Sequence, residues 1–461
     1  MTEDLTELGD LLGTGRVIED PDLLVSYGTA LRGPSGRAAF VAEPGDVSEV
    51  SAVAAWAYRH RRRLVVQGAN TGLVGASTPD DSGDQGVLSL RRLDGIGDFD
   101  IVAKTIDVEA GVSLRALNDF LAPHQLFFPV EVGSNPTVGG MLATNAGGAN
   151  TVRYGNAGDR VSGIEAVVAD RVGSLIGTLD RPRKDNSRLD VTRMMVGSYG
   201  SLGVIVRARL SLADLPTTRA TALLALETDE AVSECLRHLR PLLGESLLAF
   251  ELISGEAMRM TLASSTGIPR PFGDREHGCY VLVEIGSGAR SDLDATLADV
   301  LDHLVETNPG IMSDAVIAPP PDLWRLRHSL TEGTRGPGST LRFDIGMSPA
   351  HLSELRRRLT EELAGPGAPT ISEFGHWAEG GTHLQLIYQS ILSPRQEETA
   401  RQVVYDVVVG EFAGSFSAEH GLGPYNASFY ERYIPPAERR LDRRLKSAFD
   451  PRGVWGREPL S

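Results

Sequence analysis

The chain has 461 residues, of which 41% are hydrophobic and 23% are charged, and its formal net charge is −16 at pH 7. This length allows two domains with substantial cores, so a single small module is excluded. The acidic charge argues against a nucleic-acid partner, because binding there depends on clustered cations. No apolar run is long enough to span a bilayer, so we expect no membrane span.

The N-terminus and the cysteines bear on localisation and redox chemistry. The chain begins MTEDLTELGD, which is too acidic for a secretory signal or an Arg-rich transit peptide, so we expect a cytoplasmic protein. Cys235 and Cys279 cannot form a disulfide framework and have no metal-ligand spacing. We expect both to be small buried hydrophobes.

The first part of the chain predicts a helix and strands around a glycine-rich loop. Asp46 and Glu49 predict a capping box for a helix that ends at His60. Hydrophobic patterns then predict strands at 64–66, 87–90, 101–112 and 163–168, and a helix at 113–121. The loop after the first strand, within VVQGANTGLVGAS at 65–77, offers backbone N–H groups of Asn70, Thr71 and Ser77, which suit a pyrophosphate. Its spacing matches neither a Rossmann fingerprint nor a Walker loop.

Two further glycine stretches follow this loop. Residues 131–155 read EVGSNPTVGGMLATNAGGANTVRYG, in which we expect Thr137 to cap a short helix of small residues against which a ligand can lie. Residues 197–205 read GSYGSLGVI, a turn before a β-branched run. Three such loops, separated by strands and helices, point to one large cofactor.

From about residue 219 the pattern changes to alternating strands and helices. Strands are predicted at 221–227, 247–253, 280–285, 340–345 and 383–388, and helices at 230–243, 292–305 and 349–363. This order predicts an antiparallel sheet with helices on one side, forming a cap. We interpret 319–321 and 365–369 as turns, and 435–449 as a basic helix.

The cap sequence also contains a candidate metal site. His376 and His383 flank a glycine turn in GHWAEGGTH, and Glu419 and His420 follow in SAEHG. Two imidazoles seven residues apart across a turn can meet at one point, and a carboxylate from a later turn completes a three-ligand set. A single histidine in such a position is more often a packed or surface residue. The hypothesis of a metal site therefore depends on all four residues together.

Together the glycine loops and this constellation resemble the FAD-binding proteins of the vanillyl-alcohol-oxidase (VAO) type, in the branch of D-lactate and D-2-hydroxyglutarate dehydrogenases and the glycolate oxidase flavin subunit. The resemblance covers residues from about 40 to about 453. Where the family has T-G-L-V-G-G-S and G-S-E-G-T-L-G-V-I, this chain substitutes Ala76, Tyr199 and Ser201. Near the end, the family's F-D-P motif is present, but its later asparagine is replaced by the sequence around Trp455.

The resemblance implies an α+β fold in which a two-subdomain FAD-binding domain of the p-cresol methylhydroxylase (PCMH)/VAO type is joined to an antiparallel-sheet cap. It places the FAD domain at 1–212, the cap at 213–410, and a C-terminal segment at 411–461 that returns to the FAD domain and completes the active site. FAD is expected to be non-covalent, because no histidine stands in the first loop to tether it. The expected FAD contacts are Gly68, Asn70, Thr71, Gly72, Gly75, Ala76 and Ser77; Gly133, Ser134, Val138, Gly139, Gly140, Ala143, Thr144, Asn145, Gly147 and Gly148; and Val204 and Ile205.

The family motifs also imply roles in the cap. His376, His383 and Glu419 would hold a divalent metal, for which zinc is favoured over manganese and iron, and His420 would face the substrate as general base. Arg327, Thr331, Arg342 and Gln385 would contact the substrate with His420. On spacing alone, solvated arginines are the simpler interpretation of Arg327 and Arg342. A guanidinium nevertheless suits a carboxylate.

The expected FAD site, metal ligands and base together predict oxidation of a D-2-hydroxy acid to the 2-oxo acid, with hydride passing from C2 to flavin N5. Three alternatives remain open: an FAD-linked oxidase acting on a specialised biosynthetic hydroxy or amino acid, a metal-dependent hydrolase without redox chemistry, and a flavin subunit that only passes electrons. The sequence leaves the electron acceptor open among an electron-transfer flavoprotein, a quinone and oxygen, and it leaves a homodimer open as an alternative to a monomer.

Overall fold

The computed structural model of the chain describes residues 3–33, 35–180, 184–288, 291–457 and 459–460. The chain forms two compact units. The first unit comprises Met1–Gly147, Gly155–Leu215 and His420–Ser461, and the second unit comprises Gly148–Tyr154 and Pro216–Glu419. The second glycine stretch therefore leaves the first unit after Gly147, and the C-terminal segment returns to it at His420.

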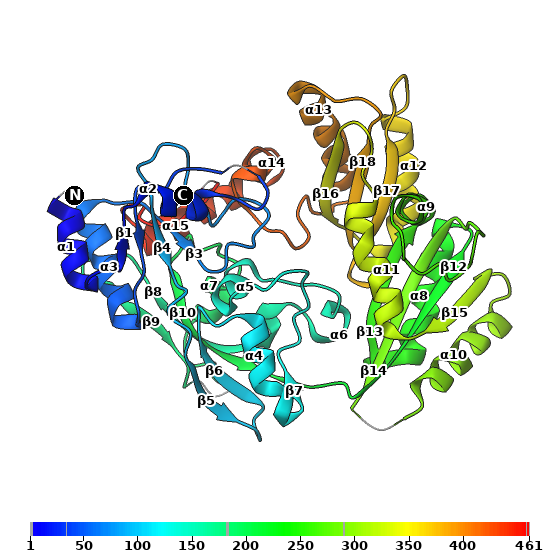
Figure 1. The fold of residues 1–461 in the computed structure, drawn as a ribbon, viewed down its shortest axis with the longest axis horizontal. Helices are drawn as coiled ribbons and strands as arrows, with labels where there is room; N and C mark the ends of the chain where they lie inside the picture. Colours follow the sequence, from blue (N-terminus) through cyan, green and yellow to red (C-terminus); the bar gives the residue numbers. More distant parts are fainter. Residues whose placement is uncertain (1–2, 34, 181–183, 289–290, 458, 461) are drawn as a thin grey trace. The chain divides into compact units, whose positions relative to one another are not determined.

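Two sheets form the centre of the first unit (Figure 1). One has the order β1-β2-β4-β3, in which β2, β4 and β3 are parallel, and the other is the antiparallel sheet β5-β6-β10-β8-β9. The strands of the sheets, with the small pair β7 and β11, are β1 Val17–Ile18, β2 Val41–Ala42, β3 Leu64–Gln67, β4 Gly86–Ser89, β5 Ile96–Asp100, β6 Thr105–Glu109, β7 Leu126–Phe127, β8 Val161–Val167, β9 Leu175–Thr178, β10 Val204–Ser211 and β11 Ala213–Asp214. The helices are α1 Glu3–Leu12, α2 Pro21–Gly28, α3 Val47–His60, α4 Leu114–Leu121, α5 Val138–Thr144, α7 Val191–Met195, α14 Ala427–Tyr433 and α15 Pro436–Phe449.

Helix α3 begins where the capping pattern predicts. Asp46 accepts a hydrogen bond from the Glu49 backbone N–H at 2.9 Å. The Glu49 carboxylate reaches back to the N–H of Gly45 at 2.6 Å rather than to Asp46, so the reciprocal half of the box is displaced by one residue. The helix then buries its apolar face, which comprises Val50, Val53, Ala54, Trp56 and Ala57.

The prediction of one strand over 101–112 is wrong. Within this range only Thr105–Glu109 is a strand, β6, and residues 101–104 form the turn that joins it to its antiparallel partner β5. The turn contains no glycine or proline to mark it. It forms because Asp100 accepts the N–H groups of Val102 and Ala103, and Lys104 adopts a left-handed φ of 52°.

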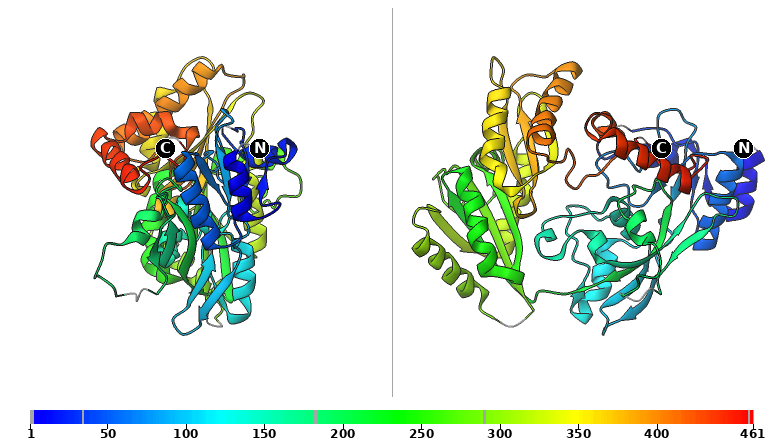
Figure 2. Two further views of the ribbon diagram at one scale, coloured as in Figure 1. Left: turned by 90° about the vertical axis from the view of Figure 1, so that its left-hand side faces the viewer. Right: turned by 180° about the vertical axis from the view of Figure 1, so that it is seen from behind.

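The second unit is built on a seven-stranded antiparallel sheet of order β15-β12-β14-β13-β17-β18-β16, which Figure 2 shows from two further sides. Its strands are β12 Thr218–Leu226, β13 Leu247–Ser254, β14 Cys279–Ser287, β15 Asp314–Ala318, β16 Thr340–Gly346, β17 Thr370–His376 and β18 Gly381–Ile387. Its helices are α6 Thr151–Tyr154, α8 Asp229–Leu243, α9 Gly255–Ser264, α10 Leu293–Thr307, α11 Pro320–Gly333, α12 Leu352–Glu362 and α13 Pro394–Tyr405, followed by a π-helical turn at Asp406–Glu411. Sequence patterns missed β15, β17, α9 and α13, and the predicted turn at 319–321 is instead the start of α11, where proline fits the first turn.

Helices cover both faces of this sheet, so the prediction that they lie on one side is wrong. Phe374 and Glu373 are consecutive in β17 and therefore point to opposite faces. The Arg327 guanidinium of α11 lies 4.9 Å from the Phe374 ring centre, whereas Glu373 accepts a hydrogen bond from Arg356 of α12 at 3.2 Å. We call these the α11 face and the α12 face.

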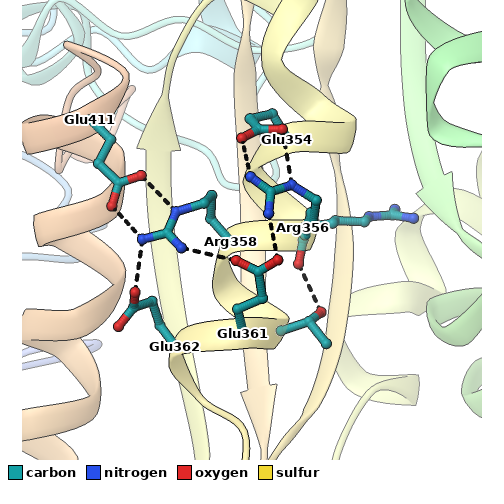
Figure 3. A network of polar contacts seen from close by, with 8 residues as sticks. Glu354, Arg356, Arg358, Glu361, Glu362 and Glu411 are labelled. Atoms are coloured by element: carbon teal, nitrogen blue, oxygen red, sulfur yellow. Dashed lines mark hydrogen bonds and ion pairs between the residues drawn. The ribbon is translucent and has the colours of Figure 1, made fainter.

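The exposed side of α12 carries an ion-pair network. Figure 3 shows Arg358 between Glu362 of the same helix and Glu411 of the π-helical turn, at 2.7 and 2.8 Å. Arg356 points away from this network, toward the sheet. The network joins α12 to the end of the unit, although each exposed pair contributes little by itself.

Two predictions from composition can be compared with the structure. Cys235 and Cys279 are buried and free, as predicted. Among the helices that the structure describes, none combines the length and the apolar character needed to cross a membrane.

Asp450 holds the C-terminal segment against the first unit. Its carboxylate accepts from the N–H groups of Val454 and Trp455 at 2.8 and 2.7 Å and from Lys446 at 2.6 Å. Lys446 also donates to the carbonyl of Ser201 in the third glycine loop at 2.8 Å. The segment then hydrogen-bonds to the first residue of β3, where Leu64 donates to the carbonyl of Val454.

Replacing Asp450 with alanine should lower the free energy of unfolding by about 3 to 5 kcal/mol, because Lys446 then loses its buried partner. Urea unfolding followed by circular dichroism measures this loss. The control is Asp214→Asn, which breaks the exposed pair between Lys104 and Asp214 and should cost less than about 1 kcal/mol. Equal losses in the two variants would contradict this account of the segment.

Candidate functional site

The first glycine loop leaves β3 and folds back on itself. Asn70 and Gly75 adopt left-handed φ values of 55° and 74°. The Ser77 hydroxyl donates to the Asn70 side chain at 2.8 Å, and Gln67 donates to the Ser77 carbonyl at 2.7 Å. The side chains of Asn70 and Ser77 therefore shape the loop, which leaves its backbone to meet a ligand.

The C-terminal segment binds the carbonyl groups of this loop. Arg457 donates to the carbonyls of Gly75, Thr78 and Pro79 at 3.3, 2.8 and 3.0 Å, and the Tyr425 N–H donates to the carbonyl of Val74 at 3.1 Å. The backbone N–H groups of residues 70–77 form no hydrogen bond to any residue that the structure describes. A loop with bound carbonyls and unpartnered N–H groups is suited to hold an anion.

The second stretch forms α5, and its two adjacent glycines have different roles. Thr137 caps the helix by accepting from the Gly140 N–H at 3.3 Å, as predicted. A Cβ atom on Gly139 would lie 2.7 Å from Ala110 Cβ, so Gly139 permits close packing inside the unit. A Cβ on Gly140 would meet only the Thr137 hydroxyl, at 3.3 Å, and one on Gly133 would meet nothing within 4 Å. Gly140 and Gly133 therefore border open space.

The third loop lies against the end of α5. The N–H groups of Gly197 and Tyr199 donate to the carbonyls of Leu142 and Ala143 at 3.0 and 2.9 Å. Several predicted ligand residues here have structural roles: Asn145 accepts from the Gly158 N–H at 2.9 Å, and Thr144 donates to the Gly140 carbonyl. Val138, Val204 and Ile205 are buried in the core of the first unit.

The predicted metal ligands converge at one end of the seven-stranded sheet. His376 ends β17, His383 lies in β18, and a turn through Gly380, with a left-handed φ of 81°, connects the strands. The ring centres are 5.7 Å apart. The Nε2 atoms of His376 and His383 lie 3.8 and 3.6 Å from the two carboxylate oxygens of Glu419.

Asp344 belongs to this cluster, although sequence reasoning missed it. Ligand atoms of Asp344, His383, Glu419 and His420 all lie within 4.8 Å of one another. His376 is not in this set, although its Nε2 lies 3.8 Å from Glu419. Asp344 pairs with His383 across β16 and β18 and accepts the Glu419 N–H at 3.0 Å. The sequence contains a signal for Asp344, because residues two apart in a strand share a face and Arg342 is a predicted substrate residue.

A buried carboxylate, Glu251, also contacts the site. It accepts from Arg327 Nε at 2.7 Å, and its other oxygen lies 2.6 Å from His376 Nδ1. Burial opposes its ionisation, yet His376 and Arg327 hold the pKa of this carboxyl well below its usual range. Burial also opposes a charge on the His376 ring, but Glu251 outweighs it and raises the pKa of His376 to about 9. A metal that binds this imidazole must therefore displace a proton.

The remaining predicted substrate residues occupy different surroundings. Arg327 is buried on the inner side of α11, whereas Thr331, one turn later in the same helix, is exposed. Arg342 donates to the Thr331 carbonyl at 3.2 Å and pairs across the strands with Gln385. Gln385 is 1% exposed, and its Oε1 has no hydrogen-bond partner in the described part of the chain.

Comparison with known proteins identifies the family. Residues 38–174 match the FAD binding domain family, and residues 215–457 match the C-terminal domain of FAD linked oxidases. The chain belongs to the FAD linked oxidase family. A mitochondrial D-2-hydroxyglutarate dehydrogenase of Bos taurus is 33% identical, over 95% of this chain and 80% of that protein. A D-2-hydroxyglutarate–pyruvate transhydrogenase of Saccharomyces cerevisiae is 28% identical, over 98% of this chain and 93% of that protein.

Solved structures confirm the predicted VAO/PCMH fold. A p-cresol methylhydroxylase superposes with a TM-score of 0.73 at 15% identity, covering 98% of this chain and 95% of that one. An alkyldihydroxyacetonephosphate synthase superposes with a TM-score of 0.75 at 15% identity, covering 98% of this chain and 84% of that one. The family match and the relatives named dehydrogenases show that the protein is an FAD-linked oxidoreductase, which argues against the hydrolase alternative. The first unit fits the cofactor, because unpartnered N–H groups can hold its pyrophosphate and the open sides of Gly140 and Gly133 leave room for its body.

Gly140→Leu should lower FAD occupancy without unfolding the protein, because its side chain would enter the open space beside α5. The control is Gly139→Leu, which should instead destabilise the first unit by overpacking against Ala110. The ratio of flavin to protein absorbance measures occupancy, and thermal unfolding measures stability. Full occupancy in a folded Gly140→Leu protein would rule out this part of the cradle.

Proposed function

We propose that the protein oxidises the CH–OH group of a D-2-hydroxy acid to the 2-oxo acid, with non-covalent FAD as hydride acceptor and a divalent metal at the acid site. The observation that carries the proposal is the approach of two imidazole Nε2 atoms, one from His376 and one from His383, to the Glu419 carboxylate. The family supports the redox half of the proposal, and the names of the relatives support a hydroxy acid as substrate.

The donor set fits a catalytic metal. Two imidazoles and one carboxylate are a common three-ligand set for zinc, and such a set leaves a coordination position for substrate. The contact between His376 Nδ1 and Glu251 supports ligation through Nε2, as metal-binding histidines usually use their second nitrogen in this way. Asp344, whose carboxylate holds the Glu419 N–H, orients the third ligand.

The metal and FAD each supply one part of the chemistry, and the chain supplies the base. A bound divalent metal lowers the pKa of a coordinated hydroxyl, and FAD accepts the hydride. His420 follows Glu419 directly and has a ring nitrogen within 4.8 Å of ligand atoms of Asp344, His383 and Glu419. His420 is our candidate for the base that takes the hydroxyl proton.

Arg327 and Arg342 account for acid recognition in this proposal. The hydrogen bond to Glu251 uses Arg327 Nε, so its two terminal nitrogens can form a paired contact with a substrate carboxylate. Arg342 and the buried amide of Gln385 lie side by side on neighbouring strands. They are suited to a second polar group, which favours a dicarboxylic hydroxy acid over lactate.

His383→Ala should abolish reduction of the flavin by substrate while FAD stays bound, because FAD is held by loops in the first unit. The measurement is anaerobic bleaching of the flavin by a D-2-hydroxy acid, together with the metal content of the protein. His303, which is exposed on α10, provides the control His303→Ala and should behave as the parent. Undiminished reduction in His383→Ala would refute the metal assignment.

Arg342→Ala should impair D-2-hydroxyglutarate more than D-lactate, because only the longer acid has a distal carboxylate. A hydrogen bond to a charged group contributes about 1.5 to 3 kcal/mol, so the selective loss in kcat/KM is roughly 10- to 200-fold. Steady-state kinetics on both acids measures it. Equal losses in kcat/KM on both acids, or no loss on either acid, would show that Arg342 does not bind the distal carboxylate.

A further inference from the structure

Glu251 lies in the middle of β13. It contacts one residue that is proposed to bind the metal and one residue that is proposed to bind the substrate carboxylate. It is 0% exposed, and its side chain is on the α11 face of the sheet, between α11 and β17. One carboxylate oxygen faces Arg327 at 2.7 Å, and the other faces His376 at 2.6 Å. These partners are 76 and 125 residues away in the chain.

The arrangement determines which atoms of each partner remain available. A carboxylate at Nδ1 requires the proton on that nitrogen, so the lone pair of a neutral His376 is on Nε2, toward Glu419. A carboxylate at the Arg327 Nε fixes the plane of the guanidinium, which also lies over Phe374. The planar group then presents its terminal nitrogens in one direction only.

We infer that Glu251 is a positioning residue that holds a metal ligand, His376, and the substrate-carboxylate clamp, Arg327, in one fixed arrangement. This inference rests on the proposed function. Its consequence is that metal affinity and substrate binding depend on the same buried carboxylate, although Glu251 itself touches neither metal nor substrate. Neutralising Glu251 should weaken both together.

Glu251→Gln tests this inference, because glutamine has the same shape but offers one acceptor and one NH₂ group. The amide can satisfy Arg327 or His376 but meets the other partner with a donor. We expect the metal dissociation constant to rise by about 10- to 100-fold, the usual effect of losing such a support. We expect KM for the D-2-hydroxy acid to rise by at least about 10-fold as the clamp loosens.

The matched control is Glu373→Gln. Glu373 is also 0% exposed and also pairs with an arginine, but it lies on the α12 face with Arg356. This variant should lower the melting temperature while leaving the metal dissociation constant within about threefold of the parent, because Glu373 faces the other side of the sheet and, among the described residues, its side chain shares no hydrogen-bond partner with Glu251. A merely structural role of Glu251 would make the two variants alike.

Metal affinity is measured without turnover, by competition between the FAD-loaded protein and a chromogenic zinc chelator. A parent protein that binds no metal would overturn the proposed metal function and this inference with it. A parent that binds metal, with Glu251→Gln binding it equally well, would overturn only the role of Glu251. If Glu251→Gln does not fold, Glu251→Asp replaces it, since a carboxylate shortened by one methylene cannot reach both partners; parent-like metal affinity and KM in that variant would also overturn the inference.

Discussion

A carboxylate buried inside a sheet has to be neutralised, and in this protein that requirement organises the acid site. Glu251 has no exposure, and water cannot solvate its charge. Arg327 and His376 supply the compensating donors. Because each donor has further atoms that Glu251 does not use, the same contact that stabilises the core also directs a guanidinium and an imidazole toward the site.

In the first unit, the first glycine loop is held in its folded form through its carbonyl groups rather than through its backbone N–H groups. Arg457 and the N–H of Tyr425 bind the carbonyls of the first glycine loop. Its N–H groups stay available for an anion. Asp450 and Lys446 in turn hold the segment that carries Arg457. The C-terminal segment therefore holds the first glycine loop through its carbonyl groups.

Local signals in the sequence predicted the features that depend on neighbouring residues. The cap at Thr137 and the convergence of His376 and His383 follow from short spacings, and both appear in the structure. Glu251 was not predicted, because a glutamate in an apolar strand gives no sign of partners that are far away in the chain. The contacts of Arg457 were missed for the same reason, whereas Asp344 shares a strand face with Arg342 and could have been predicted. The turn at 101–104 lacks the usual turn residues. The family resemblance supplied FAD and the substrate class, which spacing alone did not.

We propose that one bound flavin and one metal together oxidise a D-2-hydroxy acid. Anaerobic titration of the purified, metal-loaded protein with the D and L forms of 2-hydroxyglutarate, followed by flavin absorbance, tests it most directly. We expect that the D form bleaches the flavin, that the L form does not, and that removing the metal with a chelator prevents bleaching until zinc is restored. Equal bleaching by both forms, or bleaching that persists after complete metal removal, would contradict it.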